Sequence, residues 1–161
     1  LIYAAQYSTT AGTIIHQKPT RRFFVIVWTA AAYGAAACLF ALHQFLPSIW
    51  GSALGLFFLS TFYAAIAVVI WRYYSARRVV QLSLWALCVG LIMVELIWAL
   101  ILLPLDYASL ALLSTWCWYL IQLLIRFHLG EKGIVWKKQL AFLIYNAVLF
   151  AAVLLFVVRW V

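Results

Sequence analysis

The sequence predicts an all-α, polytopic integral membrane protein, and two observations lead to that prediction. The chain has 161 residues, of which 70% are hydrophobic and only 9% are charged, a composition outside the range of soluble domains. Its hydrophobic residues form five runs, each close to the roughly 20 residues that a helix needs to cross a bilayer. The runs lack the alternating pattern of a membrane barrel strand. We therefore expect an antiparallel bundle of five transmembrane helices.

The predicted elements follow from these runs and from the signals between them. Residues 1–22 are too polar to cross a membrane and predict a cytoplasmic tail or an interfacial segment. Residues 23–161 form a single transmembrane domain, because no internal repeat or second domain is visible. Connectors are short, which makes consecutive helices antiparallel neighbours, and Pro47 and Pro104 stand where a helix should end. The five predicted helices are residues 23–46, 49–71, 79–103, 105–127 and 139–160.

Basic residues lie mainly on one side of the predicted bundle. Ten of the eleven Lys and Arg residues precede the first helix or border the connectors after the second and fourth, whereas Arg159 follows the fifth. Because basic residues accumulate in cytoplasmic loops, the N-terminus is predicted in the cytoplasm and the C-terminus outside. We expect a location in the cytoplasmic (inner) membrane of a prokaryote, with anionic lipid headgroups against the basic connectors. Basic residues scattered over several short loops argue against binding of nucleic acid.

Small residues predict how the helices pack. The first helix has alanine or glycine at seven of the eight positions from 30 to 37. Inside lipid, small residues let helix backbones approach closely, so we expect this helix at the centre of the bundle. Gly51 and Gly55 form a GxxxG motif on the second helix, which we interpret as a contact within the chain in preference to a dimer seam.

Glu95 is the candidate functional residue. It interrupts an apolar run, where a carboxylate is costly, about 12 Å from the outer end of its predicted helix at 1.5 Å per residue. It shares a helix stripe with Trp98 and Cys88, which we expect to face the bundle. Antiparallel packing brings hydroxyl-bearing residues of the other helices to the same depth, and we expect them to form a polar cluster with Trp98 around the carboxyl. These residues are Tyr33, Ser60, Thr61, Ser114 and Thr115.

Two further polar groups are predicted. Gln122 and Asn146 lie nearer the cytoplasm and are expected to pair through their amides across adjacent helices. His43, Asp106 and Arg159 predict the mouth of a small outward cavity, with an ion pair between Asp106 and Arg159. The three cysteines contain no CxxC pair, and no two histidines match in depth, so we expect no metal site, haem or other cofactor.

The sequence indicates a class of protein more clearly than an activity. Reactive groups are scarce, and no P-loop, dinucleotide-binding glycine pattern or serine nucleophile motif is present. The first hypothesis is non-enzymatic: an accessory or assembly subunit of a larger membrane complex or homo-oligomer, or a binder of a lipid, pigment or isoprenoid between its helices. The second is a small transporter or membrane-embedded enzyme with Glu95 as proton carrier or acid/base. Secondary transporters usually contain internal repeats, which favours the first hypothesis.

Overall fold

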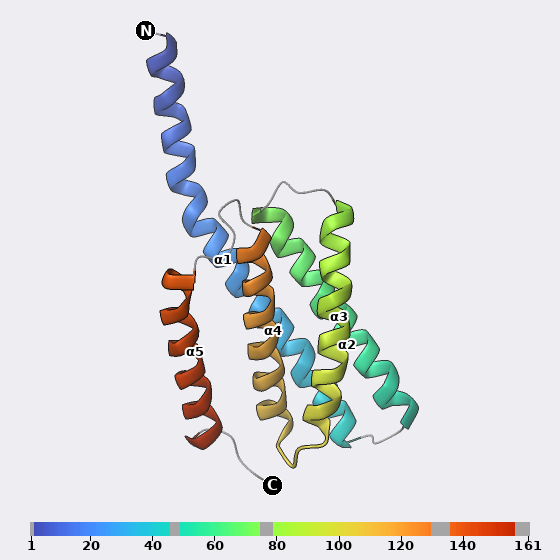
Figure 1. Ribbon diagram of the computed structural model, residues 1–161. Coiled ribbons are helices and arrows are strands. Elements are labelled where there is room, and N and C mark those ends of the chain that lie inside the picture. The colour runs from blue at the N-terminus through green and yellow to red at the C-terminus, as the bar shows by residue number, and fades with distance from the viewer. Residues whose placement is uncertain (1, 46–48, 75–78, 130–135, 157–161) are drawn as a thin grey trace.

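The protein is all-helical over the residues that the computed structural model describes, which are 2–45, 49–74, 79–129 and 136–156. Successive helices run in alternating directions (Figure 1), and the predicted all-α bundle is confirmed for this part of the chain. The helices are α1 (Ile2–Phe45), α2 (Ile49–Tyr74), α3 (Val79–Ile101), α4 (Tyr107–Leu129) and α5 (Trp136–Phe156). Side chains are described for residues 22–45, 53–72, 74, 81–129 and 139–155.

Within the described residues, four helices are long and apolar enough to cross a membrane. Their apolar segments are Arg22–Phe45, Ala53–Arg72, Gln81–Ile101 and Tyr107–Leu129. In α5 the described apolar segment, Gln139–Leu155, is shorter. The predicted end of the fifth crossing, at residue 160, lies outside the described residues.

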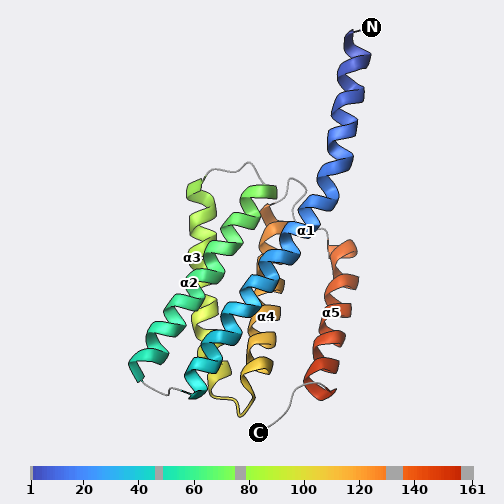
Figure 2. The same ribbon diagram turned by 180° about the vertical axis from the view of Figure 1, so that it is seen from behind.

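α1 is longer than the predicted first helix. It begins at Ile2 and continues to Phe45, so its first part extends well beyond the bundle (Figures 1 and 2). Residues 2–22, predicted as a tail, therefore continue the helix that contains the first apolar segment. That segment, Arg22–Phe45, matches the predicted crossing at 23–46.

The connector between α3 and α4 shows why the two helices end and begin there. The Leu103 N–H donates to the Leu100 carbonyl at 3.0 Å, which closes the last turn before Pro104, whose ring disfavours further helix. Asp106 then caps α4: its Oδ2 accepts from the Ser109 N–H at 3.3 Å. This bond satisfies one of the N–H groups that the first turn of a helix leaves free.

α4, and not α1, is the most enclosed helix. It packs against α1, α2 and α3, and 56% of its apolar span is buried, compared with 22% for α1. On α1, Ala32 and Ala36 are buried, whereas Ala30, Ala31 and Gly34 are exposed. The alanine-rich segment thus contributes one packing face, and the prediction of a central first helix was wrong.

Small residues allow α2 to approach both of its sequence neighbours. A Cβ added at Gly55 would lie 3.1 Å from Leu39 Cδ1 on α1, and one added at Gly90 of α3 would lie 3.8 Å from Ala64 Cβ on α2. Gly55 therefore packs within the chain, as its GxxxG spacing predicted. The surroundings of Gly51 lie outside the described side chains.

Candidate functional site

Buried polar contacts of the bundle gather between α2 and α4. The hydroxyl of Tyr63 lies 3.1 Å from Ser114 Oγ and 3.0 Å from Thr115 Oγ1. The Tyr63 ring stacks on Trp118, with centroids 5.3 Å apart, and the Trp118 indole donates to the Tyr63 carbonyl at 2.9 Å. These hydrogen bonds join the two helices inside the apolar core, where each partner satisfies the other.

The predicted hydroxyl cluster around Glu95 is therefore not what the structure shows. Ser114 and Thr115 bond to Tyr63, while Ser60 and Thr61 donate to backbone carbonyls of their own helix at 2.8 and 2.7 Å, as hydroxyls in helices often do. Residues at the same depth in the bundle as Glu95 therefore do not face it. Tyr63 itself was missed, although a tyrosine in mid-span, away from the interface level that its ring usually prefers, was an available signal.

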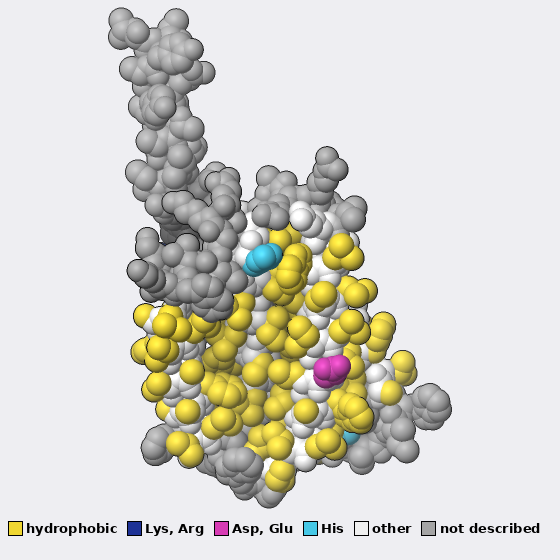
Figure 3. Space-filling view, viewed as in Figure 1, with side chains coloured by type: hydrophobic (Ala, Val, Ile, Leu, Met, Phe, Trp, Pro, Cys, Tyr) yellow, Lys and Arg dark blue, Asp and Glu magenta, His cyan; other side chains and the backbone are white. Residues whose placement is uncertain are grey.

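Glu95 lies on the outer face of α3. Its side chain is exposed, as are those of Cys88 and Trp98 in the same stripe. Figure 3 shows an acidic side chain within a largely hydrophobic surface. The stripe was predicted to face the bundle, but α3 is apolar on all sides, so its sequence does not distinguish the packed face from the free one. The buried face is formed by Leu82, Val89, Met93 and Ile97.

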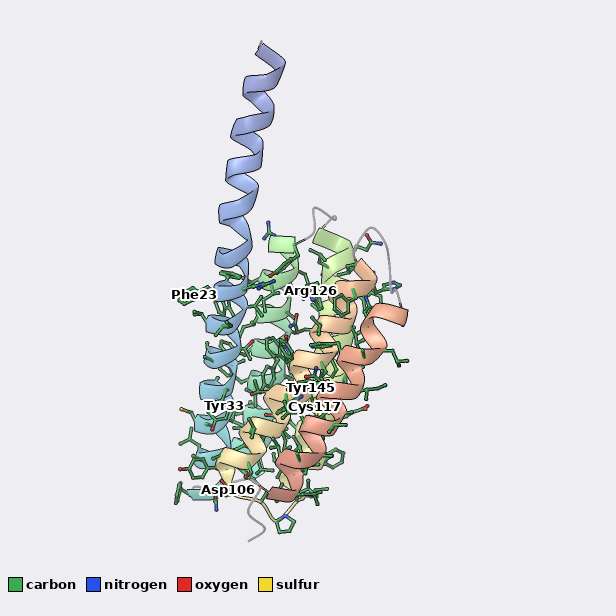
Figure 4. The ribbon with its side chains drawn as sticks, turned by 90° about the vertical axis from the view of Figure 1, so that its left-hand side faces the viewer. Phe23, Tyr33, Asp106, Cys117, Arg126 and Tyr145 are labelled. Atoms are coloured by element: carbon green, nitrogen blue, oxygen red, sulfur yellow. The ribbon has the colours of Figure 1, made fainter. Side chains whose placement is uncertain are left out.

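An open cavity of about 550 Å³ lies between α1 and α4, with Asn146 as the lining residue from α5, and its volume is within the size range of small-molecule sites. Apolar atoms form most of its wall, including the ring of Trp116, which also meets Phe150 of α5 edge to face, with centroids 5.8 Å apart. Tyr33, which also lines the cavity, lies near the middle of the apolar segment of α1, Arg22–Phe45 (Figure 4). The hydroxyl and amide groups of the wall belong to Thr29, Tyr33, Thr115, Tyr119 and Asn146.

Some of these polar groups already have partners in the chain. Thr29 Oγ1 and Asn146 Nδ2 each donate to the carbonyl four residues earlier in their own helix, at 2.8 and 2.9 Å, and Thr115 bonds to α2. The remaining polar groups of the wall are the hydroxyls of Tyr33 and Tyr119, the side-chain oxygen of Asn146, and the Trp116 indole N–H, which is buried and has no hydrogen-bond partner within the described residues. They are the groups that a bound molecule would meet first.

The predicted amide pair does not form. Asn146 bonds to its own helix at the cavity, whereas Gln122 is 0% exposed and its backbone carbonyl accepts from Trp71 Nε1 at 3.1 Å. Neither amide atom of the Gln122 side chain has a hydrogen-bond partner within the described residues. Burial of an unpaired amide is costly, so α4 carries an interior polar group that the described helices do not satisfy.

The three residues of the predicted outer mouth have different positions. His43 lines a second cavity of about 340 Å³ beside the connector between α3 and α4. Asp106, the cap of α4, lies near the end of the bundle opposite Phe23 and Arg126 (Figure 4). Arg159 lies outside the described residues, so its ion pair with Asp106 stays a prediction. In the described part of the chain, no group of three His, Cys, Asp or Glu residues is placed to hold a metal ion.

Comparison with known proteins does not assign this chain to a family, so its function must be inferred from its own residues. No protein-family model, curated protein or solved structure matches this chain. The features that need a functional explanation are the cavity between α1, α4 and α5 and the exposed acid on α3.

Proposed function

We propose that this chain is a non-enzymatic integral membrane protein that binds an apolar molecule with one polar end in the cavity between α1, α4 and α5. The cavity wall supports this proposal: it is mainly apolar, with a few hydroxyl and amide groups. Such a combination is usual for small-molecule sites, where apolar area supplies affinity and a few polar groups fix orientation. A lipid, an isoprenoid or a pigment has the matching chemistry.

Access to the cavity suits a ligand that arrives through the membrane. Ile26 and Tyr33 line the cavity and remain 64% and 38% exposed, so it communicates with the surface beside α1. In the membrane-embedded state that we propose, this surface contacts acyl chains. An apolar ligand could then exchange laterally between the cavity and the bilayer without crossing water.

The proposed orientation follows the charges at the two ends of the bundle. We place the end near Phe23 and Arg126 in the cytoplasm and the Asp106 end outside. Arg126 lies over the ring of Tyr74, 4.6 Å from the centroid, a cation–π contact that suits a charge held at the membrane surface.

A transporter or enzyme that uses Glu95 has less support. Glu95 is exposed on α3 and lines neither of the two cavities described above. Cavity and acid lie on different sides of the bundle, since α5 and α3 are on opposite flanks (Figure 1). The binding proposal therefore does not involve Glu95.

Two neighbouring alanines allow a direct test of ligand binding. Ala30 lines the cavity, whereas Ala31 is also exposed but is not part of its wall. Ala30→Trp should fill the cavity, and Ala31→Trp should leave it open. We would measure saturable binding of a radiolabelled C20 isoprenoid alcohol to the purified full chain in detergent by scintillation proximity.

The expected result is binding that weakens at least about tenfold in Ala30→Trp, equivalent to about 1.4 kcal/mol, and is unchanged in Ala31→Trp. Circular dichroism and gel filtration would show that both variants are folded. Equal binding by the two variants would refute the assignment of the cavity as the site. Failure of both the isoprenoid alcohol and a fatty alcohol of similar length to bind saturably would refute the proposed ligand class.

A further inference from the structure

The outer face of α3 carries a regular stripe that the cavity does not explain. Its members are spaced alternately four and three residues apart, the last directly after the helix end, and all are exposed. Such a spacing is that of the seam along which two helices pack in a left-handed coiled coil. The three leucine side chains and the tryptophan side chain are 61–74% exposed, so no described part of the chain covers the stripe. The stripe consists of Leu84, Cys88, Leu91, Glu95, Trp98 and Leu102.

The presence of Glu95 favours a protein partner for this stripe in preference to lipid alone. It lies six residues before Ile101, the end of α3, which places it about 9 Å along the helix from that end. An ionisable side chain at membrane depth almost always faces protein or a polar cavity. The hydroxyls at its level are bonded to Tyr63 or to their own helix backbone. Within the described residues Glu95 has no hydrogen-bond or ion-pair partner, which favours a partner from another chain.

We infer that a second copy of this chain covers the stripe, with the two α3 helices packed in parallel about a twofold axis. Two copies inserted in the same orientation are related by an axis along the membrane normal, which brings equivalent residues to the same depth. In a parallel seam, each residue meets its equivalent and the residues one turn away. Glu95 of each copy thus meets Glu95 of the other at the axis and lies beside the other copy's Trp98, one turn away.

These two side chains are complementary across the axis. The indole of Trp98 has a single N–H donor and no acceptor, whereas the carboxyl oxygens of Glu95 accept hydrogen bonds. A twofold interface uses the same surface on both copies, so the Glu95–Trp98 contact forms twice. The Glu95–Trp98 contact is thus the polar link that favours a second copy as the partner, and pairing through α3 leaves the cavity on the other flank free.

The native cysteines provide a test in the intact protein. Cys88 lies in the seam, Cys38 is exposed on α1, and Cys117 is partly buried on α4. We would oxidise the full chain with copper phenanthroline in phosphatidylethanolamine–phosphatidylglycerol vesicles and separate the products on non-reducing gels. We expect a disulfide-linked dimer that persists in the Cys38→Ser/Cys117→Ser double variant and is lost in Cys88→Ser.

A double-mutant cycle tests the polar contact itself. In the same vesicles, dimerisation of fluorophore-labelled chains would be measured by energy transfer for Glu95→Leu, Trp98→Phe and the combined variant. Each single change should lower the association constant by about threefold to tenfold, and Trp98→Phe should have little further effect once Glu95 is replaced. Glu95→Gln keeps an acceptor oxygen and should retain most of the association.

Several results would overturn the inference. A chain that remains monomeric at all lipid-to-protein ratios would do so, as would a dimer linked through Cys38 alone. A cycle in which the two substitutions act independently would refute the Glu95–Trp98 contact. If Cys88 in native membranes crosslinked only to a protein of different mass, the occupant of the stripe would be that protein and not a second copy.

Discussion

A single phenol hydroxyl connects α2 to α4 at the residue scale. Tyr63 reaches both Ser114 and Thr115 because a phenol can donate one hydrogen bond and accept another. Tyr63→Phe would keep the ring stacked on Trp118 but remove both bonds. We expect the free energy of unfolding to fall by about 1 kcal/mol, in the range measured for hydrogen bonds between transmembrane helices.

Unfolding by sodium dodecyl sulfate in lipid–detergent bicelles, followed by tryptophan fluorescence, would measure this loss. Tyr145→Phe is the matched control, since Tyr145 on α5 is 67% exposed. The Tyr145→Phe control should unfold at the same concentration of sodium dodecyl sulfate as the wild-type protein. Equal stability of all three proteins would show that the Tyr63 hydroxyl makes no net contribution.

Asp106 allows its observed role as a cap to be separated from its predicted role in an ion pair. Its Oδ2 accepts the Ser109 N–H, a bond that Asn can reproduce and Ala cannot. Asp106→Ala should therefore lower stability by about 1 kcal/mol, whereas Asp106→Asn should have little effect. The same unfolding assay would distinguish the roles: an equal loss in both variants would indicate that the charge, and hence a cationic partner such as Arg159, is what matters.

Residue-level predictions from the sequence were wrong where the face of a helix decides which side chains meet. Glu95 was found to be unusual because a carboxylate in an apolar run is costly wherever it points. Its surroundings were predicted wrongly for two reasons. Both faces of α3 are apolar, and the depth of a residue in the bundle does not show which face of its helix it occupies. Tyr119 was missed as a cavity residue for a similar reason, because the spacing of residues on α4 does not show which of its faces lies beside α1.

At the scale of elements, close packing of α2 against α1 depends on the absence of a side chain at Gly55. The nearest atom to a Cβ there would be Leu39 Cδ1 at 3.1 Å. Gly55→Ile would push the helices apart or force Leu39 into another rotamer, and should cost about 1 to 3 kcal/mol. The comparison variant is Gly34→Ile, since nothing lies within 4 Å of a Cβ at Gly34.

Thermal unfolding of the two glycine variants in detergent would check this prediction. Only Gly55→Ile should melt at a lower temperature than the wild-type protein. A melting temperature that falls equally in both variants would point to a general effect of isoleucine on these helices, and would contradict a specific contact between α1 and α2.

Most helix bounds could be predicted because the length of an apolar run sets the length of a crossing helix. The starts of α2 and α3, at Ile49 and Val79, coincide with the predicted ones. The start of α1 could not be predicted in this way, since the helix continues through polar residues back to Ile2. Polar residues in that segment remove the hydropathy signal without preventing helix formation.

For the whole molecule, the proposed orientation makes a prediction about the C-terminus. Ten of eleven basic residues belong to one side of the predicted arrangement, so a reporter fused after Val161 should be active only if it functions outside the cytoplasm. Alkaline phosphatase, which folds outside, should therefore be active, and green fluorescent protein should be dark when exported by the same route. The opposite pattern would reverse the orientation or remove one crossing.

The position of α4 between the two flanks determines how ligand binding and self-association would relate. α4 contacts α1 on one side and α3 on the other, so a dimer joined through α3 would carry its two cavities at its outer edges. Neither cavity would contain residues from both copies. Ligand would then bind with a stoichiometry of one per chain and without cooperativity, and the Hill coefficient would remain at unity whether the protein is diluted to monomers or concentrated to dimers.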